Sequence, residues 1–155
     1  MKEKGQGLVE FAIIVPFLMA LSIAIIYLGA LFLDYTQYNN AARDAARDIS
    51  LQTGTDTNAA TLRKTLATKI NDGDATTLAR YATPMTSLYG AKWKVQFYKD
   101  SALQNDNPNS ATDVEVIIYL TLDKQAGGLL AEWGVLPQEL KPIVFRMALE
   151  RVTSK

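Results

Sequence analysis

The chain has 155 residues and a formal net charge of zero, because 16 lysines and arginines balance 16 aspartates and glutamates. A nucleic-acid-binding protein usually has an excess of positive charge, which this chain lacks. No nucleic-acid partner is therefore expected. The sequence has no cysteine and no histidine, which excludes disulfides, thiolate metal sites and the commonest general base. We therefore expect no enzymatic activity, no catalytic residues, no cofactor and no metal site.

The first predicted element is a membrane-spanning helix at residues 11–33. This stretch of 23 residues has no charged side chain, and as a helix it covers about 34 Å, enough to cross a bilayer core of about 30 Å. A buried helix of a soluble protein would show a polar stripe, and a signal peptide would have a shorter apolar core. Lys2 and Lys4 precede the run, so the positive-inside rule predicts a cytoplasmic N-terminus and an outer location for everything after Leu33.

Two residues of this region stand out. Glu10 is a single carboxylate at the edge of the apolar run, where a charge is costly and is therefore a functional candidate. Pro16 lacks a backbone donor, so we expect a kink or a loosened hydrogen bond between residues 12 and 16.

The helical pattern continues beyond the membrane. Apolar and small residues follow a 3-4 spacing on one face, namely Leu28, Leu31, Tyr35, Tyr38, Ala42, Ala45 and Ile49. We predict a single helix over residues 6–52, membrane-spanning at 11–33 and amphipathic at 34–52. The face formed by Tyr35, Tyr38, Ala42, Ala45 and Ile49 is predicted to pack against a globular head at 53–155.

The head is predicted to begin with a loop and a short helix. Residues 53–61 are rich in Thr, Asn and Asp and favour a loop. Residues 62–71 place Leu62, Leu66 and Ile70 at i, i+4 and i+8, which is typical of a short amphipathic helix.

Three alternating segments predict strands, at residues 91–99, 113–123 and 143–149. Their apolar faces contain Trp93, Val95 and Phe97; Val114, Val116, Ile118, Leu120 and Leu122; and Ile143, Phe145, Met147 and Leu149. The other face of the second strand, with Ile117, Tyr119 and Thr121, is apolar enough to be covered as well. We expect an α+β fold in which an antiparallel sheet of three or four strands packs on the alanine stripe of the long helix.

Two acidic turns carry enough oxygen ligands to be candidate ion sites. The oxygen-rich group in the loop after the first strand (Asp100, Asn105, Asp106, Asn107 and Asn109) lacks the spacing and the closing glutamate of a calcium loop. The same holds for Asp72 and Asp74, so both segments are interpreted as solvated turns.

Two segments of the long helix resemble the TadE-like family of the tight-adherence (Tad/Flp) pilus system. They are GQGLVEFAIIVP at residues 5–16 and NNAARDAAR at residues 39–47. A short basic leader that ends in Gly5, with Glu10 at the fifth position after it, is similar to the prepilin processing pattern. The resemblance implies a leader at 1–5, cleavage between Gly5 and Gln6 by an aspartyl prepilin peptidase, and a role of Glu10, Phe11 and Pro16 in assembly and register. Glu10 would pair with the new α-amine of Gln6 in a neighbouring subunit.

The family resemblance also implies a pilin-like fold and a place in the bacterial inner membrane, with transfer to a cell-surface pilus on assembly. The head is larger than in major Flp pilins, which favours a minor pilin or pseudopilin that supports adhesion or secretion. Its partners would be other pilin subunits, the prepilin peptidase, the inner-membrane assembly platform and membrane lipid. The alternative is an uncleaved single-pass protein whose outer domain binds a ligand or a secreted partner.

Overall fold

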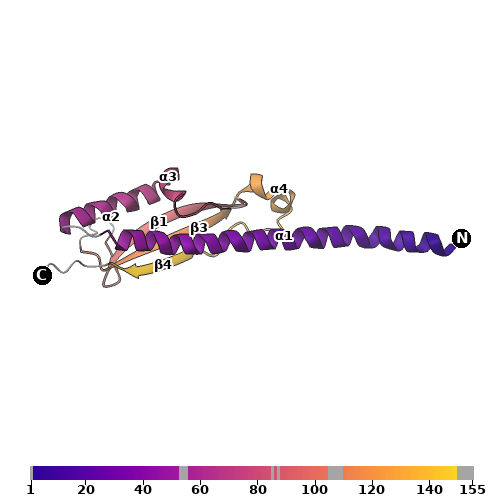
Figure 1. The fold of residues 1–155 in the computed structure, drawn as a ribbon, viewed down its shortest axis with the longest axis horizontal. Helices are drawn as coiled ribbons and strands as arrows, with labels where there is room; N and C mark the ends of the chain where they lie inside the picture. Colours follow the sequence, from indigo (N-terminus) through magenta and orange to yellow (C-terminus); the bar gives the residue numbers. More distant parts are fainter. Residues whose placement is uncertain (1, 53–55, 85, 87, 105–109, 150–155) are drawn as a thin grey trace.

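The computed structural model describes residues 2–52, 56–84, 86, 88–104 and 110–149. The elements in chain order are α1 (Lys2–Ser50), α2 (Asp56–Asn71), α3 (Ala75–Leu78), β1 (Tyr89–Lys99), β2 (Ala102–Leu103), β3 (Asp113–Leu122), α4 (Lys124–Glu132) and β4 (Ile143–Ala148). The predicted α+β class is confirmed. Figure 1 shows α1 as a long rod whose C-terminal half packs in the head and whose N-terminal half projects from it.

The sheet has the strand order β2-β1-β3-β4, and all of its pairings are antiparallel. The predicted strands match β1, β3 and β4 within two residues at each end. Asp100 and Ser101 connect β1 to β2 with positive φ angles of 48° and 69°. This is the geometry of a two-residue hairpin turn whose twist fits the flanking strands. The short strand β2 thus lies in a segment that was predicted to be loop.

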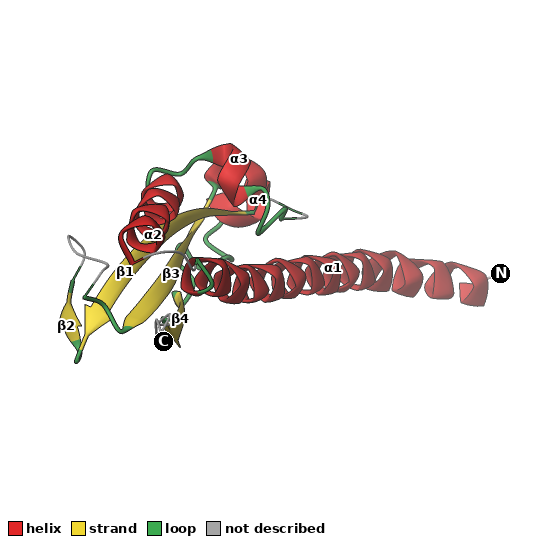
Figure 2. Ribbon diagram, turned by 60° about the vertical axis from the view of Figure 1, so that its left-hand side comes forward, coloured by secondary structure: helices red, strands yellow, loops and turns green. Residues whose placement is uncertain are grey.

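Helices α1 and α2 cover one face of this sheet (Figure 2). α1 packs against β3 and β4, whereas α2 packs against β1. Three alanines of α1, Ala42, Ala45 and Ala46, are completely buried. Because a methyl group is the only side chain at these positions, the helix backbone approaches the sheet closely. The core of the head therefore lies between the two helices and the sheet, and it includes Ile70 of α2 and Trp93 of β1 as well as the α1 alanines and the apolar face of β3.

No described element covers the other face of the sheet, which we call the open face, and here the sequence-based expectation was wrong. Ile117 is only partly buried, and Tyr119 and Thr121 are exposed. Charged neighbours make this face compatible with water, since Lys92 pairs with Tyr119 and Lys94 with Ile117 across β1 and β3. Other polar groups on this face interact with one another. The Arg146 guanidinium lies 3.0 Å from the Asp113 carboxylate and 4.6 Å from the centre of the Tyr98 ring, and it holds the pKa of Asp113 below its usual value.

The helix α2 differs from its prediction in two ways. It begins at Asp56, so most of the predicted loop at 53–61 is helical, and residues 53–55 lie outside the described part of the chain. Ala59 and Ala60 are both buried, and this burial outweighs the low helix propensity of the neighbouring threonines. The buried stripe is also shifted: Leu62 is half exposed, whereas Arg63, Ala67 and Ile70 are buried.

Arg63 connects α2 to the C-terminal end of α1. Its Nη2 donates a hydrogen bond to the carbonyl oxygen of Ser50 at 3.2 Å, and both residues are buried. The Ser50 hydroxyl in turn donates to the Arg47 carbonyl at 2.9 Å and lies 3.3 Å from the sulfur of Met147 on β4. A cation at this position satisfies a terminal helix carbonyl and interacts favourably with the helix dipole.

We expect Arg63→Met to lower the free energy of unfolding of the head by about 1–3 kcal/mol, because it leaves the buried Ser50 carbonyl without its charged donor. The measurement is urea denaturation of the full chain in detergent micelles, followed by near-UV circular dichroism. Lys64→Met changes the next residue, which is exposed, and should shift the value by less than about 0.5 kcal/mol. Equal effects of the two substitutions would contradict this role of Arg63.

Candidate assembly segment

The N-terminal half of α1 lies outside the head and is strongly apolar. Large side chains along it are mostly exposed, for example Phe11 at 68%, Ile13 at 70% and Phe17 at 71%. By length and composition, α1 is a helix that can cross a membrane, and its most apolar window is not buried in the protein. A core helix of a soluble protein would be buried here. The exposed surface therefore needs an apolar environment, either lipid or other chains.

The predicted processing and register residues all lie on this projecting part of α1. Gly5 and Gln6 fall within the helix, and their side-chain environment is outside the described structure. Glu10, Phe11 and Pro16 are exposed. Glu10 follows Gln6 by four positions, which is about one turn of α1. The helix continues through Pro16 without interruption, so no break accompanies the missing donor.

The predicted head-packing residues lie at the other end of α1. Tyr38, Ala42, Ala45 and Ile49 are buried, and Tyr35 is partly buried against the same core. The structure adds Ala41 and Ala46, which are at most 1% exposed. Each is the neighbour of a predicted alanine, so the buried face is wider than a single 3-4 stripe. The doubled Ala-Ala pairs in the sequence were the available signal for this width.

The helix enters the head at a polar junction that the sequence analysis did not single out. Asp34, the first charged residue after the apolar run, is only 5% exposed, and its carboxylate accepts a hydrogen bond from the Thr86 hydroxyl. Tyr38 lies one turn further along α1. Burial raises the pKa of the Tyr38 hydroxyl, and the nearby charge of Asp34 raises it further. The carboxylate thus fixes the helix to the segment before β1 instead of facing water.

Within the described residues, no group of three or more acidic side chains lies close enough to hold a metal ion. Asp74 acts locally: its carboxylate accepts a hydrogen bond from the backbone N–H of Thr77 at 3.1 Å and caps the short helix α3. The hydroxyls of Thr77 and Thr76 lower the pKa of Asp74. In the loop after β1, the second candidate ion site, Asp100 forms a turn and residues 105–109 lie outside the described part.

Comparison with known proteins identifies one similarity. A family model described as TadE-like protein matches residues 5–47. The match starts at Gly5 and ends at Arg47, so it covers the exposed half of α1 and most of the part that packs in the head. No curated protein and no solved structure matches the chain. The resemblance inferred from the two sequence segments of the long helix is confirmed.

The junction at Asp34 provides a test of how α1 is held in the head. Thr86→Val removes the hydroxyl that donates to the buried Asp34 carboxylate while keeping the side-chain shape. We expect a loss of about 1–3 kcal/mol in the free energy of unfolding, measured by urea denaturation in detergent micelles. Thr83→Val changes an exposed threonine of the same loop and serves as the control. A control as destabilised as Thr86→Val would argue against the junction.

Proposed function

We propose that this chain, a TadE-like protein of the Tad pilus system, is a minor pilin or pseudopilin that is cleaved after Gly5 and assembles through the exposed half of α1. The observation that carries the proposal is the family match, which begins at the proposed cleavage site and extends along the whole apolar segment. The function is then mechanical, namely to prime, cap or stabilise a pilus that serves adhesion or secretion. The family is structural and not catalytic.

The glycines around the proposed cleavage site support processing. Gly5 and Gly7 flank Gln6, and each glycine costs a helix about 1 kcal/mol relative to alanine. A Cβ atom added at Gly7 would meet nothing within 4 Å, so the described structure gives no packing reason for a glycine there. Two glycines in three residues make this the part of α1 that unwinds most easily. An extended backbone without side chains is what a peptidase needs to approach.

Glu10 supports assembly through its charge. Once α1 leaves the membrane boundary for a filament, the carboxylate must lie among apolar side chains, and an unpaired buried charge is very costly. Cleavage after Gly5 creates an α-amine on Gln6, one helical turn before Glu10. The amine of a neighbouring subunit is a cation of the right kind to pair with it. Such a pair sets the axial position of one subunit relative to the next.

The proposed location is the bacterial inner membrane, with the N-terminus in the cytoplasm and the head outside, before assembly. The partners in this proposal are other pilin subunits, the prepilin peptidase, the assembly platform and membrane lipid. A second candidate is an uncleaved membrane-anchored binding domain. It is favoured by the open face of the sheet, where Tyr119 and Val144 are 41% and 52% exposed.

Processing is tested by intact mass. Co-expression with the prepilin peptidase of the same host should remove residues 1–5 from the wild-type chain. Gly5→Asp should keep the full mass, because a charged side chain at the cleaved bond blocks access of the peptidase. Gly7→Ala tests the matched position beyond the bond and should still be cleaved. An unchanged wild-type mass in the presence of active peptidase would favour the anchored binding domain.

Assembly is tested separately with Glu10→Ala. Removing one member of a buried ion pair costs about 3–5 kcal/mol, so the amount recovered in sheared filaments should fall by about 100-fold or more. Membrane insertion should be unaffected, because the apolar run is unchanged. Glu132→Ala removes an exposed carboxylate of the head and should assemble normally. Normal filament recovery of Glu10→Ala would disprove the assigned role of Glu10.

A further inference from the structure

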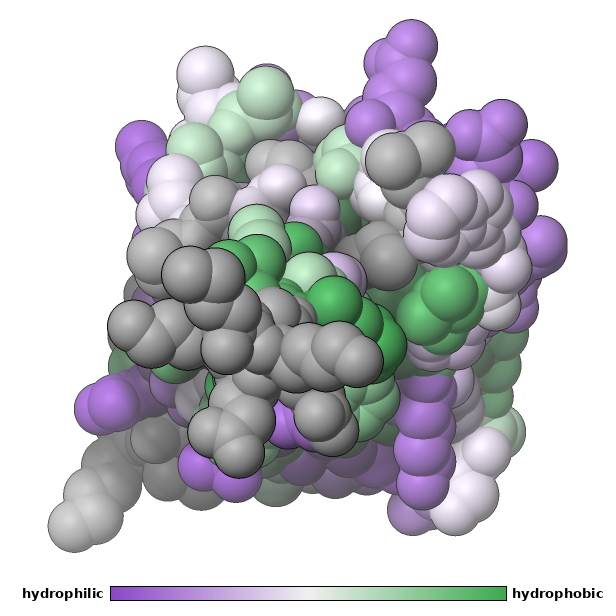
Figure 3. All heavy atoms as spheres, turned by 90° about the vertical axis from the view of Figure 1, so that its right-hand side faces the viewer, coloured by the Kyte–Doolittle hydropathy of each residue, from purple (hydrophilic) through white to green (hydrophobic). Residues whose placement is uncertain are grey.

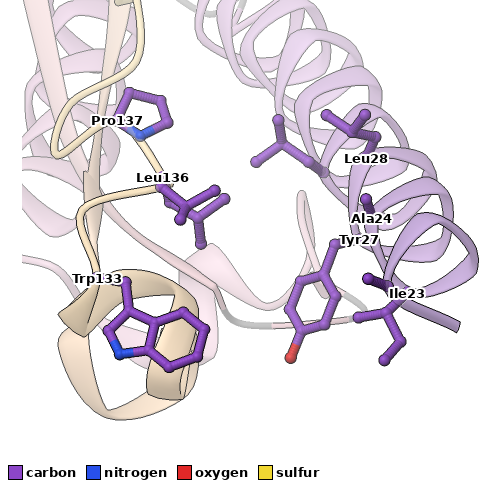
Figure 4. A pocket seen from close by; sticks show the side chains of 10 residues that line it. Ile23, Ala24, Tyr27, Leu28, Trp133, Leu136 and Pro137 are labelled. Atoms are coloured by element: carbon purple, nitrogen blue, oxygen red, sulfur yellow. The ribbon is translucent and has the colours of Figure 1, made fainter. Parts of the chain in front are cut away.

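An apolar groove lies between α1 and the connection from β3 to β4. One wall is the α1 surface around Ile23, Tyr27 and Leu28, and the other is formed by Trp133, Val135 and Leu136. Its volume is about 400 Å³. Figure 4 shows Trp133 and Tyr27 on opposite sides of the groove, with Leu136 on the side of Trp133 and Leu28 on the side of Tyr27. We call residues 133–137 the groove loop.

The groove loop is held in this position by glycine geometry. α4 is broken at Gly128, which has φ 51° and ψ −140°, and it is followed by Gly134 with φ 68°. Both angles are unfavourable for other residues. These two turns direct the loop toward α1 while leaving Trp133 71% and Val135 64% exposed. Two large apolar side chains are thus presented to the surroundings from a structured turn.

The level of the groove along α1 indicates what surrounds it. With the membrane span at residues 11–33, the bilayer midplane falls near residue 22 and the outer boundary near residue 33. The α1 wall of the groove extends from Ala20 to Leu31, so most of it lies within the outer leaflet. Viewed along α1 from its N-terminal end, hydrophobic residues gather near the centre and hydrophilic residues at the periphery (Figure 3). Ile23 and Leu28, which line the groove, are 47% and 63% exposed, so the groove adjoins the exposed apolar surface of the helix.

We propose that the groove holds an acyl chain of an outer-leaflet phospholipid and that Trp133 and Val135 insert into the membrane interface. The inference rests on the membrane orientation in the proposed function, but not on cleavage. Tryptophan is enriched at this interface because its ring is apolar and its N–H is polar. A helix of a second copy fits less well, since one helical turn, about 5.4 Å long and 10–12 Å wide, already fills about this volume. The head is then attached to the membrane at two places, through α1 and through the groove loop.

The test uses the absence of cysteine from the chain. Val135→Cys and Val144→Cys replace valines that are 64% and 52% exposed, the first in the groove loop and the second on the open face of the sheet. Each full-length variant is labelled with a nitroxide in vesicles of phosphatidylethanolamine and phosphatidylglycerol. Oxygen, which partitions into lipid, and a water-soluble nickel chelate then report the surroundings of the label. We expect the ratio of oxygen to nickel accessibility to be several-fold higher at position 135 than at position 144.

A third variant, Ile14→Cys, separates failure of this inference from failure of its premise. Its label should be in lipid. Lipid exposure at 14 with water exposure at 135 overturns the groove proposal and leaves the proposed function intact, whereas water exposure at both positions overturns both. Spectral broadening at 135 that grows with protein density would identify a second copy as the occupant and also overturn the proposal. Lipid exposure at 135 in a chain that is never cleaved supports the groove and contradicts pilin processing.

Contact with acyl chains is measured directly by fluorescence. Phospholipids brominated on their acyl chains should quench the wild-type emission in the same vesicles. Trp133→Phe leaves only Trp93, which is 5% exposed in the core of the head, and should lose most of this quenching. Quenching that is equal in the two proteins would overturn the assignment of Trp133 to lipid.

Discussion

The structure depends on the close packing of one continuous helix against two strands. Ala42, Ala45 and Ala46 have no exposed surface, and they let the backbone of α1 approach β3 and β4. A larger side chain at any of them would force the helix away from a core that is packed at nearly crystal density. The same helix continues for 49 residues, so one element forms both the projecting half and part of the core of the head.

The junction at Asp34 explains how a polar head can begin immediately after an apolar helix. A charge next to a membrane boundary usually faces water, but Asp34 is buried and accepts a hydrogen bond from Thr86. The negative charge of Asp34 therefore lies inside the head, where the Thr86 hydroxyl stabilises it. The apolar surface of α1 extends to the groove, whose lining includes Tyr27, Leu28 and the exposed Trp133. Two aromatic side chains thus lie where the helix meets the groove loop.

The sequence predicted helices and strands most accurately where a strict hydrophobic period coincided with burial in the structure. The single helix, the strands containing Trp93, Val116 and Ile143, and the α+β class followed from periodicity and the lack of charge. The start of α2 was missed because burial of Ala59 and Ala60 outweighs local threonine propensity. The exposure of Tyr119 was missed because alternation cannot tell whether a second layer exists. Asp34, Arg63 and Trp133 were missed because their roles depend on contacts with residues far away in the chain.

The energetics of assembly follow from the character of the exposed half of α1. Lipid and neighbouring helices both remove its apolar side chains from water. The hydrophobic effect alone therefore does not favour a filament over a bilayer. The difference must come from packing and from polar groups, and Glu10 is the only carboxylate between Gly5 and Leu33. On the proposed function, its pairing with a new α-amine favours the filament only after cleavage. Processing then acts as the switch, because the nitrogen of Gln6 is an uncharged peptide nitrogen before cleavage and becomes a cationic α-amine only after it.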